Sequence, residues 1–116
     1  MLPNENRDSK TTTKNMLIFN TTYKVSTKVN DNWLNWTKEN HIPFMLESGS
    51  FSKAQITKIV GSEDEEGTSY SVQFHIADMD TLMSWHKNNA STFQSNCAAA
   101  FGTEVSFFST VLELID

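Results

Sequence analysis

Six segments of alternating type, rather than any single motif, most constrain how this chain can fold. Two segments have apolar positions three or four residues apart, which is the spacing of one helical face. The first of these helices should be capped by Asp31 and end at Gly49, and the second should be capped by Asp78 and end at Gly102. Four other segments are rich in β-branched and aromatic residues and predict strands: residues 16–29, 51–60, 68–76 and 105–115.

The resulting order, β-α-β-β-α-β, predicts the fold class. It most simply gives an α+β, ferredoxin-like sandwich, in which a four-stranded antiparallel sheet carries both helices on one face. Because β-α-β crossovers are right-handed, the first and third strands should form the central pair. We expect residues 16–116 to make up this single domain, and the polar residues 1–15 to form a disordered tail outside it.

The alternation of residue types within the strands separates the two faces of this sheet. The third strand, TSYSVQFHI, alternates polar and apolar residues, so one side should face the helices and the other should stay open. The fourth strand, VSFFSTVLELI, is apolar on both sides: Phe107 shares one side with Val105 and Val111, and Phe108 shares the other with Leu112 and Leu114. Such a strand indicates a second layer against the open face. We therefore expect a homodimer through the open sheet face, with the two sheets forming an α+β barrel.

Four stretches of the sequence resemble domain-of-unknown-function family 4286, a family of short, uncharacterised bacterial proteins. They are WLNWTKENHIP, ESGSF, TSYSVQFHI and AAAFG…FFSTVLEL, and the strongest of them contains Trp33 and, further on, His41 and Pro43. The resemblance extends over residues 17–114. It implies the dimeric α+β barrel fold, and it implies no activity, because the family has none assigned.

Composition excludes several classes of function. The chain has 116 residues, a net charge of -5 and no cluster of Lys or Arg, which disfavours binding to nucleic acid. No apolar run approaches the roughly 18 residues that span a bilayer, and the first 15 residues contain no apolar core of a signal peptide. We therefore expect a cytoplasmic protein that binds neither nucleic acid nor a membrane.

The sequence also contains no cofactor or metal motif. Cys97 is the single cysteine and lies among alanines and phenylalanines, which predicts a small buried hydrophobe. The three histidines form no i, i+4 pair and have no carboxylate at ligand spacing. The acidic run of residues 63–66 lacks the spacing of a calcium loop and predicts a solvated hairpin turn. We predict no metal and no cofactor.

One histidine lies beside a helix breaker, since His41 precedes Pro43 by two residues. Proline lacks a backbone donor and collides with the preceding helical turn. The sequence therefore predicts a break, with one helix ending near Asn40 and a short second helix over residues 43–48. At such an end His41 would cap free carbonyls, where the helix dipole favours its protonated form. Alternatively, the bend would aim His41 into the barrel mouth as the best candidate for a catalytic acid or base.

The polar side of the two central strands supplies the other candidate site residues. In the first interpretation they line a small cavity and bind a ligand. In the second they satisfy one another across a dimer interface. His86 falls on the predicted apolar side of the second helix and is expected to be half-buried. The candidates for ligand binding are Asn20, Thr22, His41, Gln73 and His75.

Two functions from different classes remain open. The first is a dimeric barrel that binds a small molecule, as a cofactor-free enzyme acting on an apolar or aromatic metabolite. The second is a non-catalytic structural or protein-interaction module whose barrel interior is filled by side chains. Whether the chain is an enzyme stays open at this point. A pocket of about 300 Å³ or more beside Asn20, Gln73 and His75 would favour the first.

Overall fold

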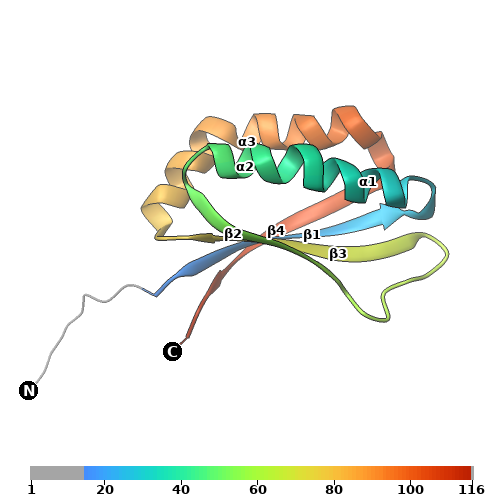
Figure 1. Cartoon of the computed structure of the whole chain (residues 1–116), viewed down its shortest axis with the longest axis horizontal. Helices are drawn as coiled ribbons and strands as arrows, with labels where there is room; N and C mark the ends of the chain where they lie inside the picture. The colour runs from blue at the N-terminus through green and yellow to red at the C-terminus, as the bar shows by residue number, and fades with distance from the viewer. Residues whose placement is uncertain (1–14, 116) are drawn as a thin grey trace, which may run out of the picture.

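The computed structural model describes residues 15–115, which form one sheet with helices on one of its faces (Figure 1). The tail predicted over residues 1–15 thus lies, except for Asn15, outside the described residues. The strands are β1 (Leu17–Ser26), β2 (Phe51–Lys58), β3 (Gly67–Ile76) and β4 (Val105–Glu113). The helices are α1 (Asn30–Trp36), α2 (Ile42–Glu47) and α3 (Met79–Phe101), joined by the short helical turns η1 (Thr27–Val29), η2 (Thr37–His41) and η3 (Gly102–Glu104).

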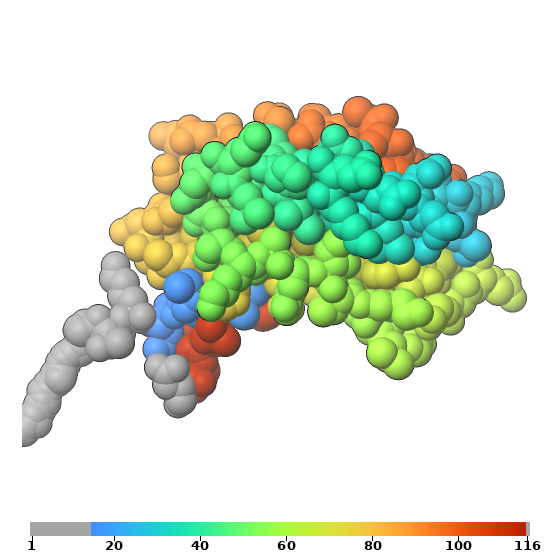
Figure 2. Space-filling view, in the orientation of Figure 1, coloured from blue at the N-terminus to red at the C-terminus, as the bar shows by residue number. Residues whose placement is uncertain are grey.

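The sheet has the topology that the sequence predicts. Its strand order is β2-β3-β1-β4, and all neighbouring pairs are antiparallel. The first and third strands are therefore the central pair, as the right-handed crossover rule requires. The helices lie over one face only, and the other face, here called the open face, carries no element of the described chain (Figure 1). The end of β4 emerges beside the start of β1 on the side away from the helical layer (Figure 2).

Aromatic side chains fill the layer between helices and sheet. The ring of Phe19 from β1 lies 5.7 Å from that of Phe51 and 5.6 Å from that of Trp85, measured between centroids. Trp33 of α1 lies 5.0 Å from both Tyr23 and Tyr70 and is fully buried. Large rings of this kind dominate the energy of a small core, so the helix-facing side of the sheet is the one that holds the fold together.

The ends of the helices agree only in part with the prediction. Asp78 caps α3, because its carboxylate accepts hydrogen bonds from the backbone N–H and the hydroxyl of Thr81, both at 2.8 Å. The prediction that Asp31 caps the first helix is wrong: α1 already begins at Asn30, because the turn η1 leads directly into it. Asp31 lies in the first helical turn, where a carboxylate still suits the positive end of the helix dipole.

The buried face of α3 differs from the predicted one. His86 is exposed, so the prediction that it is half-buried is wrong. Trp85, one residue earlier, is buried instead, together with Leu82, Phe93 and Cys97. A tryptophan ring offers far more apolar surface than an imidazole, and the helix is rotated so that this ring contacts the sheet.

A β-bulge in β2 changes which residues of that strand face the open side. The pairing with β3 shifts between Ser52 and Gln55, and Lys53 within the bulge has a φ of 50°. As a result Ser52 lies opposite His75 and Gln55 lies opposite Gln73. Simple alternation counted from the buried Phe51 would have directed Gln55 towards the helices, so the bulge adds it to the open face.

Gly67, at the start of β3, permits the close approach of β1 and gives a stability prediction. Its φ is +146°, and a Cβ built there would lie 1.9 Å from the carbonyl oxygen of Val25. We expect Gly67→Ala to lower the free energy of unfolding by roughly 3 kcal/mol or more, because backbone must move to admit the methyl group. Urea denaturation measures the loss.

Gly61 supplies the matched control for this prediction. It also has a positive φ, +84°, but an added Cβ would meet nothing within 4 Å. Gly61→Ala should therefore cost only about 1 kcal/mol, the strain of the left-handed backbone alone. Equal losses in the two variants would contradict the close-approach argument.

Candidate functional site

The helical region from α1 to α2 runs through Pro43 without a break. Residues 37–41 form a π-helix, and the N–H of Ile42 bonds to the carbonyl of Thr37, five residues earlier. Ile42 itself has helical torsions, with φ -62° and ψ -47°. The wider π turn relieves the collision that proline would cause in a regular α-helix. The predicted break near Asn40 is therefore wrong.

This π-helix turns His41 towards the sheet. Its side chain is only 3% exposed, stacks on Trp36 at a centroid distance of 5.4 Å and packs against Phe93 at 5.2 Å. Nε2 lies 3.4 Å from the hydroxyl of Tyr23, a long contact, and Nδ1 has no hydrogen-bond partner among residues 15–115. Burial lowers the pKa of His41 from 6.5 to about 4, so the ring is neutral near pH 7. The predicted role of a protonated helix cap is therefore wrong.

The position of His41 also separates it from the other candidate residues. Its contact Tyr23 belongs to the helix-facing side of β1, whereas Asn20 and Thr22 alternate with Tyr23 and belong to the open face. Gln73 pairs with Asn20 across β1 and β3, and His75 lies on the same side two residues further. The structure thus brings four of the five predicted residues together and leaves His41 on the opposite side of the sheet.

Polar side chains form a row across the open face, one from each strand. By register the row runs Gln55, Gln73, Asn20 and Thr110. Gln55 Nε2 donates to Gln73 Oε1 at 3.0 Å, and Asn20 Nδ2 donates to Thr110 Oγ1 at 3.1 Å. Gln55 was not among the predicted residues because the bulge moves it to this face. Thr110 was not among them because the register of β4 against β1 is not visible in the sequence of a single strand.

A second set of contacts makes Asn20 the centre of this network. Ser71 Oγ donates to Asn20 Oδ1, and Asn20 Nδ2 also lies 3.3 Å from Thr22 Oγ1. Asn20 and Ser71 are only 8% and 9% exposed although they belong to the open face. The amide is therefore satisfied within one chain, as a buried polar group must be.

His75 is the exception on this face. It occupies the next row, between Ser52 of β2 and Ile18 of β1, with Leu112 of β4 beyond. The side chain is half-buried, and it makes no hydrogen bond or ring contact with the described part of the chain. Its ring nitrogens are thus available to a partner from outside.

An apolar patch flanks these rows along β4, here called the β4 patch and made of Phe108, Leu112 and Leu114. Phe108 is 62% exposed, and the two leucines are 41% and 40% exposed. On the other side of the strand Val105 is buried and Phe107 is half-buried against the core. The prediction that β4 is apolar on both sides is therefore confirmed.

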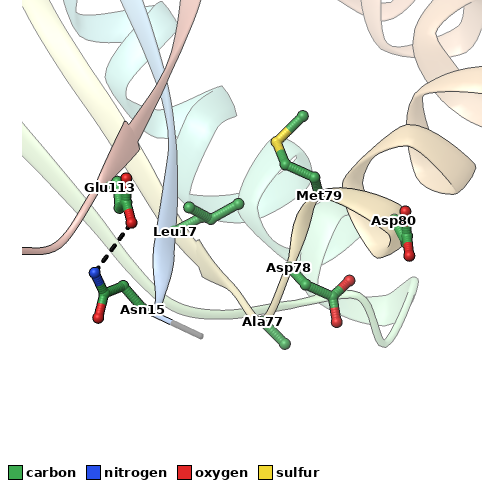
Figure 3. A pocket seen from close by; sticks show the side chains of 7 residues that line it. All are labelled: Asn15, Leu17, Ala77, Asp78, Met79, Asp80 and Glu113. Carbon is green, nitrogen blue, oxygen red and sulfur yellow. Dashed lines mark hydrogen bonds between the residues drawn. The ribbon is translucent and has the colours of Figure 1, made fainter. Parts of the chain in front are cut away.

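A separate hollow lies at the start of α3 (Figure 3). It has a volume of about 330 Å³ and carries the carboxylates of Asp78, Asp80 and Glu113 on its wall. Glu113 is turned towards Asn15, whose Nδ2 donates to it at 3.0 Å, while the two aspartates lie on the far side (Figure 3). Within residues 15–115 no group of three His, Cys, Asp or Glu side chains could hold a metal ion. The hollow is not a candidate metal centre.

Two further predictions from the sequence are confirmed, and each removes a possible functional site. The acidic run forms a solvated turn between β2 and β3, in which Glu63 pairs with Lys58 at 2.9 Å and Asp64 pairs with Lys24 at 3.0 Å. Cys97 is 4% exposed, and burial raises the pKa of its thiol.

Among residues 15–115, no helix has the length and apolar character needed to cross a membrane.

Comparison with known proteins agrees with this architecture. Residues 16–115 match the profile of a family described as "Domain of unknown function (DUF4286)". Among solved structures, the chain is similar to a dimeric ferredoxin-like protein from an uncultured marine organism, with a TM-score of 0.68 and 10% sequence identity. That similarity covers 89% of this chain and 98% of the other, and it confirms the predicted ferredoxin-like fold. No curated protein matches the sequence.

The environment of His41 gives a prediction for the pH dependence of stability. The unfolded chain takes up a proton on His41 below pH 6.5, whereas the folded chain does so only near pH 4. The free energy of unfolding should therefore be highest above pH 6.5 and fall by about 3 kcal/mol as the pH drops to 4. In His41→Phe this fall should be absent, which urea denaturation across that range would measure.

Tyr23→Phe is the control, since it removes the hydroxyl beside His41 and leaves the imidazole in place. This variant should keep the decline at acidic pH. Stability that instead declines as the pH rises through 6.5 would mean that His41 is charged in the folded state, as a helix cap would be, and would refute the buried neutral form.

Proposed function

Because the chain belongs to the DUF4286 family, whose description assigns no function, we propose a function from the geometry of the chain itself. It binds a small apolar or aromatic molecule in a chamber that two copies enclose between their open sheet faces. One observation carries this proposal: His75 is half-buried on that face and has no partner in the described chain. The side chains of the polar row, by contrast, hydrogen-bond to one another within the chain.

The homodimer is the first part of the proposal. The β4 patch exposes three large apolar side chains on a face that no helix covers, and such clustering is typical of an interface between copies. The similar solved protein is described as dimeric, which supports the same assembly here. A face-to-face dimer would cover the patch and enclose the polar row.

The ligand is the second part. Enclosing Asn20 costs little, because its amide already has partners within the chain. Enclosing His75 without a partner would leave a buried polar ring unsatisfied, at about 1–3 kcal/mol. A hydroxyl or carbonyl of a bound molecule would supply that partner, and the apolar neighbours Ile18 and Leu112 would contact its body. If the chamber supports a reaction, His75 is its acid or base.

A non-catalytic dimerisation module is the second candidate function. The observation that favours it is the same network, since polar groups that satisfy one another can be packed against a second sheet without a ligand. In that case the interior would be filled, and a partner residue would contact His75. The two functions differ in whether a small molecule binds to the dimer.

The dimer is tested with Phe108→Asp. Phe108 is 62% exposed, so the substitution should leave the fold of one chain intact while placing a charge in the interface. Light scattering at micromolar concentration should give about twice the 13.2 kDa of one chain for the wild type and that single mass for the variant. Val60→Asp, at a position 92% exposed in the β2–β3 turn, is the control and should remain dimeric. A wild-type mass of one chain would refute the dimer.

The chamber is tested with 2-naphthol, a neutral aromatic molecule with one hydroxyl group. We expect calorimetry to detect its binding to the wild-type dimer, a loss of binding in Phe108→Asp, and a weakening of about tenfold in His75→Leu because one hydrogen bond to the ring is lost. His86→Leu, which removes an exposed histidine on the helical side, should bind like the wild type. A stable wild-type dimer that does not bind 2-naphthol would favour the filled interior, and equal binding by His75→Leu and the wild type would contradict the role proposed for His75.

A further inference from the structure

A groove opens on the helix-covered side of the molecule, between α3 and the second half of β4. Its volume is about 780 Å³, within the range of small-molecule sites. Phe19 and Leu82 form its floor, and Met79, Met83 and Val111 form its walls. These three wall residues are 45%, 63% and 44% exposed, so no element of the described chain covers them.

The groove continues along α3 into a second hollow. That hollow has a volume of about 230 Å³ and shares Phe19, His86 and Ser109 with the first. Because β4 is an edge strand, no further strand of residues 15–115 closes this side of the sheet. The result is an elongated apolar channel that is open along one side and long enough for a chain-like or flat molecule.

The charges at this groove have the opposite sign to the chain as a whole. The chain has a net charge of -5, yet no carboxylate lines the groove, and Lys87 and His86 do. Lys87 makes no ion pair with any residue in the range 15–115. It follows Met83 by four residues, which puts the ammonium group and the thioether on the same face of α3. An apolar channel with one unpaired cation at its rim complements an apolar anion.

We propose that this groove binds a small molecule that joins an apolar body to one carboxylate, such as a fatty acid or an aromatic acid. The carboxylate lies at Lys87 and His86, and the body lies against Met79, Met83 and Val111. Methionine side chains are flexible and polarizable, so they adapt to bodies of different shape. The groove lies at the β4 edge of the sheet, between α3 and β4, and the inference uses only residues of one chain, so it does not depend on the proposed dimer.

Three probe molecules test the carboxylate site and the apolar site of this proposal separately: decanoate, 2-naphthoate and decanol. Calorimetry below the micelle-forming concentration should detect binding of at least one acid, and which acid binds identifies a chain-like or a flat body. Decanol, which lacks the charge, should bind more weakly than decanoate. Lys87→Gln should weaken the acid about three- to fivefold and leave decanol unchanged, because a partly exposed ion pair contributes up to about 1 kcal/mol. Lys38→Gln, which makes the same charge change on the exposed side of η2, should have no effect.

Two variants at exposed wall positions test the apolar part. Val111→Trp should fill the groove and weaken both the acid and decanol by more than tenfold, and Met83→Glu should weaken the acid more than decanol. Either variant suffices if the other does not fold by circular dichroism. Leu112→Asp, which disrupts the β4 patch at a position outside the lining of both hollows, should keep the acid site, so failure of the chamber and failure of the groove are distinguishable. Absence of binding by both acids, equal effects of Lys87→Gln and Lys38→Gln, or full binding in a folded Val111→Trp would overturn the proposal.

Discussion

The packing of aromatic rings between the helices and one face of the sheet is the interaction on which the rest of this structure depends. Trp33 is completely buried between Tyr23 and Tyr70, and Phe19 joins β1 to the tryptophan of α3. Two helical regions of this size can cover only one side of four strands. The same packing that stabilises the fold therefore leaves the other side of the sheet without a helix of the described chain over it, and the candidate site around His75 is a consequence of that asymmetry.

The open face has two regions of different chemistry, a polar centre and an apolar edge. At its centre, the side chain of Asn20 binds Ser71 and Thr110, so the polar groups there are satisfied without water. At its β4 edge, Phe108 and Leu112 expose apolar surface that nothing in the described part of the chain covers. A satisfied polar centre beside an apolar edge suits burial against another surface, and the side chain of His75 has no partner within residues 15–115. The helical side has its own uncovered apolar strip, where α3 and β4 leave Met83 and Val111 exposed.

Most of the fold could be predicted because it depends on periodicity. Alternation in TSYSVQFHI fixed the two faces of β3, and the order of elements fixed which strands are central. The predictions were wrong where one residue or one backbone hydrogen bond changes the period of the helix or strand. Pro43 predicts a break only in a regular α-helix, and a π-helix avoids it. The bulge at Lys53 reverses the alternation of β2, and the strand contains no glycine or proline that would indicate the bulge from the sequence. The spacing of apolar residues in α3 allows either Trp85 or His86 to face the sheet. The larger apolar area of the tryptophan ring decides between them, and that area cannot be read from the spacing.

The candidate site was harder to predict because the residue type alone does not determine the role of a histidine. His41 and His75 belong to the two sides of one sheet, and both lie within stretches that resemble the same family. Aromatic rings enclose His41, and burial lowers its pKa to about 4. The neutral imidazole therefore acts as a packing residue of the core. His75 is half-buried among Ile18, Ser52 and Leu112 and keeps both ring nitrogens free of partners in the described chain. A histidine can bind or transfer a proton for another molecule only where that molecule can reach it. His41 belongs to the helical layer, where the π turn directs its ring into the core, and His75 is therefore the histidine on the open face around which a site can form.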